Sequence, residues 1–106
     1  MGGHRITDTL QLAGTGEIAG SATAAAMPTL VCKWVKFKAL DDNAGTVYIG
    51  IVSGLTVANG TSDATTGWPL NPNEETDWLP VPGNDMDGFY RICDNAGDDL
   101  AYVALK

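Results

Sequence analysis

The chain has 106 residues, which is enough for one domain with a hydrophobic core of its own. Its formal net charge is −7, from 13 acidic and 6 basic residues, so it lacks the broad basic face that nucleic-acid binding needs. No window approaches the roughly 18 consecutive apolar residues of a membrane-spanning helix, and polar residues interrupt the place of a signal-peptide core, so neither segment is expected.

The first 28 residues differ in character from the rest. Residues 5–12 alternate in polarity, which places Ile6, Leu10 and Leu12 on one face of a strand. Residues 13–26 are small, with no set of large apolar side chains, and their glycines oppose a long helix. We therefore expect an extended N-terminal arm over residues 1–28, ordered by whatever it touches, and a folded domain over residues 29–106.

One tetrapeptide, Asp-Asn-Ala-Gly, occurs twice in this domain, and each copy stands between two strand-like runs. The first copy separates Trp34–Leu40 from Thr46–Ile51, and the second separates Phe89–Cys93 from Leu100–Leu105. Asp and Asn bond back to nearby backbone and Gly accepts a positive φ, so the tetrapeptide is typical of a tight turn. The sequence therefore predicts two β-hairpins.

The remaining segments complete an all-β pattern. Three lysines, at positions 33, 36 and 38, indicate an edge or solvent-facing strand. A further short strand is expected over Val52–Val57, a proline-held turn over Trp68–Asn73, and an extended edge segment over Asp77–Pro82. Together these elements predict a small antiparallel β-sandwich or jelly-roll-like barrel of about seven strands.

No catalytic, metal or cofactor site is predicted. Asn84–Gly88 spaces two carboxylates as an EF-hand loop does, but Gly83 falls at the first ligand position and the flanks are strand-like. An acidic turn is expected there. The single histidine, His4, has no nucleophile motif beside it. Cys32 and Cys93 fit either two buried thiols or a cross-strand disulfide.

The three tryptophans fall into two groups. Trp34 belongs to a long strand and is expected in or near the core. Trp68 and Trp78 flank a proline-rich acidic loop, where they either pin the loop to the sandwich or serve as interface anchors. Leu79 follows Trp78. The set expected to contact a partner protein or a sister protomer consists of Ile6, Leu10, Leu12, Trp68, Trp78 and Leu79.

Residues 34–105 resemble the small β-sandwich structural proteins of tailed bacteriophages. In that family a "G-x-V-Y-x-G" hairpin is followed by a "P-L-x-P" turn and a final "I-Y-x-I" hairpin. The segments that carry the resemblance are Val35–Ala39, Gly45–Gly50, Gly67–Pro72, Gly88–Ile92, Asn95–Gly97 and Tyr102–Leu105. The insertion at Thr61–Thr66 and the stretch Trp78–Pro82 depart from the compact pattern, and the first 28 residues lie outside it.

The resemblance implies a non-enzymatic virion protein that binds the capsid exterior as a cement or decoration protein. Its implied partners are the major capsid protein and further copies of itself, in a homotrimer, with neither nucleic acid nor membrane involved. A tail, connector or fibre component is the alternative within virions. A carbohydrate-binding sandwich that uses Trp68 and Trp78 as a stacking platform is the alternative of a different class.

Overall fold

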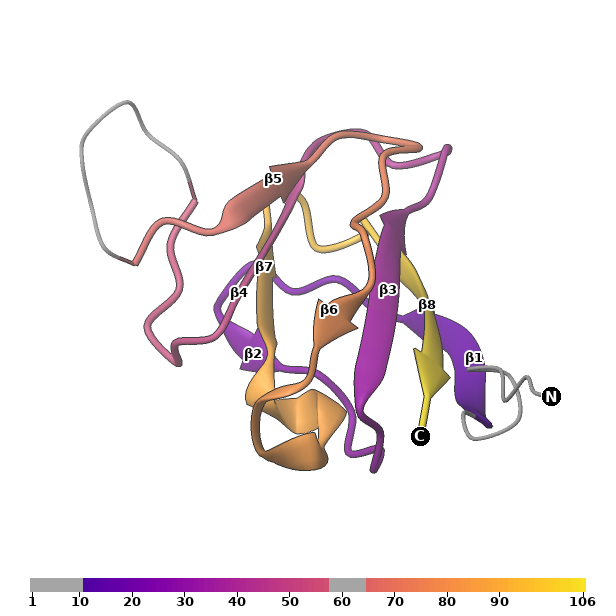
Figure 1. The fold of residues 1–106 in the computed structure, drawn as a ribbon. Coiled ribbons are helices and arrows are strands. Elements are labelled where there is room, and N and C mark those ends of the chain that lie inside the picture. Colours follow the sequence, from indigo (N-terminus) through magenta and orange to yellow (C-terminus); the bar gives the residue numbers. More distant parts are fainter. Residues whose placement is uncertain (1–10, 58–64) are drawn as a thin grey trace, which may run out of the picture.

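The computed structural model describes residues 11–57 and 65–106, so Ile6 and Leu10 lie outside the described residues. These residues form an all-β sandwich of two antiparallel four-stranded sheets, which confirms the predicted fold class (Figure 1). In sheet A the order is β1 (Leu12–Ile18), β8 (Leu100–Leu105), β3 (Trp34–Ala39), β6 (Leu79–Pro80). In sheet B the order is β2 (Ala25–Ala26), β7 (Tyr90–Cys93), β4 (Val47–Gly50), β5 (Trp68–Leu70).

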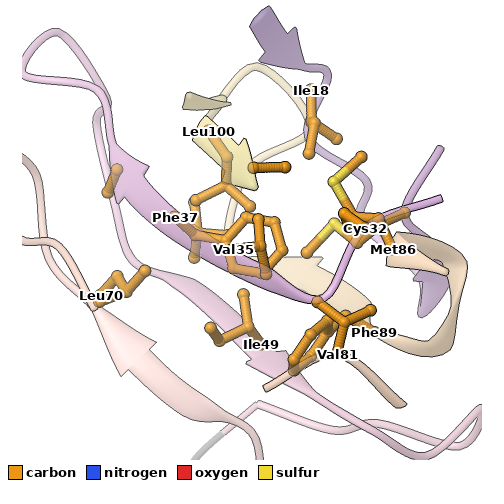
Figure 2. Close-up of a cluster of buried hydrophobic side chains, with 14 of the residues drawn as sticks. Ile18, Cys32, Val35, Phe37, Ile49, Leu70, Val81, Met86, Phe89 and Leu100 are labelled. Carbon is orange, nitrogen blue, oxygen red and sulfur yellow. The ribbon is translucent and has the colours of Figure 1, made fainter. Parts of the chain in front are cut away.

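The core lies between the two sheets and is built from their inward faces. Val35 and Phe37 project from β3 and Val47 and Ile49 from β4, because every second residue of a strand faces the opposite sheet. The Phe37 and Phe89 rings meet edge to face, with centroids 5.4 Å apart. Two short 3-10 turns, η1 (Pro82–Asn84) and η2 (Met86–Gly88), carry Met86 into one end of this core (Figure 2).

The two predicted hairpins are not formed, although the flanking strands are. β3 pairs with β6 and β8, whereas β4 pairs with β5 and β7, so the first Asp-Asn-Ala-Gly turn carries the chain from sheet A to sheet B. The second copy carries it back, from β7 to β8. Neither Gly45 nor Gly97 has a positive φ. Both turns are therefore crossovers between sheets, a use that the turn sequence alone does not distinguish from a hairpin.

The two crossover turns are bonded to each other. The Asn43 side chain donates from Nδ2 to the carbonyl oxygen of Asp99 at 2.9 Å and accepts from the Asp99 backbone N–H at 2.8 Å. The Asp98 carboxylate, only 1% exposed, accepts from the Ala44 backbone N–H at 2.8 Å. The two turns approach closely at Gly45, where a Cβ would lie 2.9 Å from Nδ2 of Asn95 and 3.1 Å from Cβ of Asp94.

The described part of the expected arm belongs to the sandwich. Residues 11–28 supply β1, which pairs with β8, and β2, which pairs with β7, and they bury Ile18 and Met27. The strands fit closely here, since a Cβ on Gly16 would lie 3.3 Å from the Tyr102 ring. Arg91 fixes the connection between the two strands by donating to the carbonyl oxygens of Ala19, at 2.9 Å, and Ala26. A sandwich without these residues would lack an edge strand in each sheet.

Several local expectations have clear outcomes. Leu79–Pro80 is an edge strand, as predicted, and the lysine-bearing β3 faces solvent on one side although it is interior to its sheet. Trp68–Leu70 is a strand where a turn was expected, and 52–57 holds a turn and an isolated bridge rather than a strand. Cys32 and Cys93 are buried free thiols, and burial raises the pKa of both.

The turn-to-turn bonds predict unequal effects of two matched substitutions. Asn43→Ala removes two bonds from a buried position, so the free energy of unfolding should fall by about 2 kcal/mol. Asn95→Ala, at the same place in the other tetrapeptide, removes one long bond from an exposed residue and should cost about 0.5 kcal/mol. Urea unfolding of both variants measures the difference. Equal losses would mean that the Asn43–Asp99 pair has no special role.

The inclusion of residues 11–28 in the sandwich predicts a steric effect at Gly20. A Cβ there would lie 1.8 Å from the carbonyl oxygen of Asp98, so Gly20→Ala should destabilise by about 3 kcal/mol. Gly97→Ala is the control, since a Cβ at Gly97 meets nothing within 4 Å. Thermal unfolding should separate the two variants. If the Gly20→Ala protein were as stable as the parent, residues 11–28 would not pack against the folded domain as described.

Candidate binding surface

A groove of about 500 Å³ opens between the two sheets along the edge formed by β5 and β6. Its floor consists of Ile49, Leu79 and Phe89, and Trp68 lines it as well. The segment that leads into β6 contributes Glu75, Thr76 and Asp77. The groove is therefore an apolar slot with carboxylates beside it, a composition and size typical of binding sites.

Trp68 is exposed because of its position in the strand register. It pairs with Ile49, while Leu70, two residues later on the same face, pairs with Val47 and is buried. The Trp68 side chain therefore points toward the core side of sheet B, where the opposite edge strand, β6, is only two residues long. With so little of sheet A opposite it, Trp68 remains 68% exposed. It is not a packing anchor for its loop.

β6 separates this groove from the outer face of sheet A. Leu79 pairs with the buried Val35 and lines the groove. Trp78, its neighbour, is 41% exposed, and the Lys36 ammonium nitrogen lies 5.5 Å from its ring centroid. The same nitrogen is 3.6 Å from the Glu75 carboxylate, so Trp78 and Glu75 share one cation.

An apolar row crosses the outer face of sheet A beside β6. The strand registers pair Leu12 with Leu105, Leu105 with Trp34, and Trp34 with Pro80, one residue from each strand. Leu12 is 60% exposed and Trp34 39% exposed, so Trp34 is not the core residue that its strand pattern indicated. A row of this kind, with large side chains open to solvent, is typical of protein contact surfaces.

The predicted contact residues thus divide between two neighbouring surfaces. Trp68 and Leu79 meet in the groove, Trp78 lies just outside it, and Leu12 belongs to the apolar row. Ile49 and Phe89 were missed because their strand patterns indicate only core. Asp77 was missed because a single acidic residue in an extended segment gives no sign in the sequence that it lies beside a groove. Because β6 is only two residues long, the groove between the sheets stays open at this edge.

The acidic residues near the groove have different partners. Glu74 accepts the Asn71 backbone N–H at 2.8 Å, and Glu75 pairs with Lys36. The Thr76 hydroxyl is buried, accepts from the Phe37 backbone N–H at 3.1 Å and donates to the Asp77 carbonyl oxygen. In residues 11–57 and 65–106 no hydrogen bond or ion pair engages the Asp77 carboxylate.

The acidic turn at residues 84–88 has a structural explanation. The Asp85 carboxylate accepts the backbone N–H groups of Asp87, at 3.1 Å, and Leu30, at 3.0 Å. These two bonds stabilise the ionised form and lower the pKa of Asp85. Within the described ranges no group of three or more histidine, cysteine or acidic residues is arranged to hold a metal ion. The same ranges contain no helix long and apolar enough to cross a membrane.

No family model, curated protein or solved structure matches this chain.

Two residues on β5 provide a test of the groove geometry. Trp68→Ala should change the free energy of unfolding by less than about 0.5 kcal/mol, because the indole is exposed. Leu70→Ala should cost about 3 kcal/mol, since that side chain is buried in the core. Chemical denaturation measures both. A large loss of unfolding free energy for Trp68→Ala would show that the indole is packed in the fold and that the groove is not open.

Proposed function

We propose that this chain is a non-enzymatic structural protein of a tailed-bacteriophage virion, which binds and stabilises the capsid exterior as a cement or decoration protein. The resemblance of residues 34–105 to small phage β-sandwich proteins supplies the virion context. The proposed partners are the major capsid protein and sister copies of this chain in a homotrimer.

The observation that carries the proposal is the exposure of all three tryptophans. Trp34, Trp68 and Trp78 are each more than a third exposed. A soluble domain of this size gains stability by burying such side chains, and tryptophan is enriched where a partner removes it from water. Leu12 adds a fourth large exposed side chain, in the apolar row with Trp34. These residues offer two adjacent contact surfaces on a rigid sandwich.

A cement protein needs only modest affinity at each contact. A capsid repeats the same binding site over its symmetric surface, and copies joined to one another bind it many times over. The rigid sandwich keeps the groove and the apolar row in a fixed relation, so little conformational entropy is lost on binding. Exposed aromatic contacts repeated in this way stabilise a shell without any chemical step.

The proposal is tested on particles of the phage that encodes the chain. Cryo-EM of purified virions should find ordered copies on the shell, dozens to hundreds by the symmetry of a capsid, with the tryptophan surfaces in contact. Particles lacking the protein should bind the purified wild-type chain. Trp34→Ala and Trp68→Ala should each weaken that binding at least about tenfold, as expected for hot-spot tryptophans.

Asp42→Asn is the matched control, because Asp42 is exposed and no hydrogen bond or ion pair in the described residues engages it. It should bind particles as the wild type does. Absence of the protein from virions would refute the proposal. Point variants are used because deleting the first 28 residues would remove β1, β2 and the buried Ile18.

Two other functions have distinct signatures in the same experiments. Roughly six or twelve copies on the tail axis would indicate a tail, connector or fibre component, by the symmetry of that axis. A carbohydrate-binding function is favoured by one observation, the exposed Trp68 indole next to carboxylates in an open groove. Aromatic stacking beside acidic hydrogen-bond acceptors suits a sugar ring, and glycan-array binding that depends on Trp68 would establish it.

A further inference from the structure

The groove between β5 and β6 combines three kinds of surface in one place. Ile49, Leu79 and Phe89 supply an apolar floor, Trp68 an exposed aromatic ring, and Glu75 and Asp77 two carboxylates. Glu75 already pairs with Lys36, but an uncharged apolar ligand would leave the Asp77 carboxylate without a partner. A strongly polar ligand would not use the floor. The combination fits a ligand with an apolar stem and a cationic, planar head.

The chain already uses this chemistry just outside the groove. Lys36 extends across sheet A with its ammonium nitrogen 5.5 Å from the Trp78 ring centroid and 3.6 Å from Glu75 Oε2. One tryptophan and one carboxylate thus hold a cation between them. Trp68 and Asp77 both line the groove, so a tryptophan and a carboxylate are again present on one surface. In the described part of the chain no cation contacts either of them.

We propose that this groove binds an arginine side chain displayed by a partner protein. The inference rests on the proposed function and specifies the chemistry of one contact with the shell. The aliphatic stem of the arginine lies along Leu79 and Ile49, while the guanidinium stacks on Trp68 and pairs with Asp77. Arginine is favoured over lysine because its planar head stacks on an indole and engages a carboxylate through two N–H groups.

The two edge strands favour insertion of a side chain over addition of a strand. β5 contains Pro69 and β6 contains Pro80. Proline has no N–H to donate to an incoming strand, and its presence on an edge protects that edge from further pairing. A partner that approaches from this side therefore contacts the groove through its side chains. The acidic groove also attracts a basic partner segment over longer distances.

The test uses the full chain and a capped Gly-Arg-Gly tripeptide as the probe, followed by ¹⁵N NMR. The indole N–H signal of Trp68 should shift on titration, with a dissociation constant on the order of millimolar, as befits a single side chain. A capped Gly-norleucine-Gly tripeptide, which has the stem without the charge, should bind at least about threefold more weakly. Added salt should weaken the arginine probe but not the norleucine control.

Two variants assign the contact. Asp77→Asn and Trp68→Leu should each weaken the arginine probe at least about threefold, whereas Asp42→Asn should not. A dispersed spectrum confirms that each variant is folded. Equal binding of the two tripeptides, an unaltered Asp77→Asn protein or the absence of any shift would overturn the inference. Trp68-dependent binding of a soluble oligosaccharide in place of the tripeptide would overturn it as well.

The two proposals fail separately. A protein found on capsids that ignores the arginine probe keeps the cement function and loses the arginine groove. A protein absent from virions that still binds the probe through Asp77 and Trp68 keeps the groove and loses the cement function.

Discussion

The sandwich depends on the bonds between its two crossover turns. Each turn moves the chain from one sheet to the other, so each leaves backbone groups that no strand partner can satisfy. The Asn43 side chain serves both backbone groups of Asp99, and the buried Asp98 carboxylate serves the Ala44 N–H. These contacts join the ends of the two sheets at the point where β3 leads into β4 and β7 into β8. The core and the groove both lie between the sheets that these contacts join.

The sequence predicted the class of fold because alternation and turn chemistry report on strands directly. It could not predict which strands would pair. An Asp-Asn-Ala-Gly sequence is compatible with a hairpin turn or with a crossover, and only the contacts with the other turn distinguish the two. The arm was expected because residues 13–26 contain only one large apolar side chain, Ile18. Their small size is instead what admits Tyr102 next to Gly16, a contact about 86 positions away in the chain that no local pattern records.

The candidate site was predictable in part. Tryptophans beside a proline-rich acidic loop indicated an anchor, and Trp68 and Leu79 do line one groove. The groove itself depends on β6 being only two residues long. Pro80 and Pro82 have no N–H to continue the strand, and no pattern of polarity in the sequence indicates this limit. The sequence does not show which carboxylate of the groove is free to bind a ligand. In the structure Glu75 pairs with Lys36, whereas Asp77 has no cationic partner among the described residues. Ile49 is a core residue that also lines the groove, and its sequence pattern indicates only the core.

The pairing of β1 with β8 has a consequence for how the protein is made. Gln11 and Lys106 bond to each other through both backbone groups. In sheet A the first described strand, β1, therefore pairs with the last, β8. β8 also lies between β1 and β3, and without it neither strand has its main neighbour in that sheet. A ribosome must therefore release residues 100–105 before sheet A can assemble. Until then β1 and β3 lack the strand that lies between them in sheet A, and their apolar faces stay open to solvent.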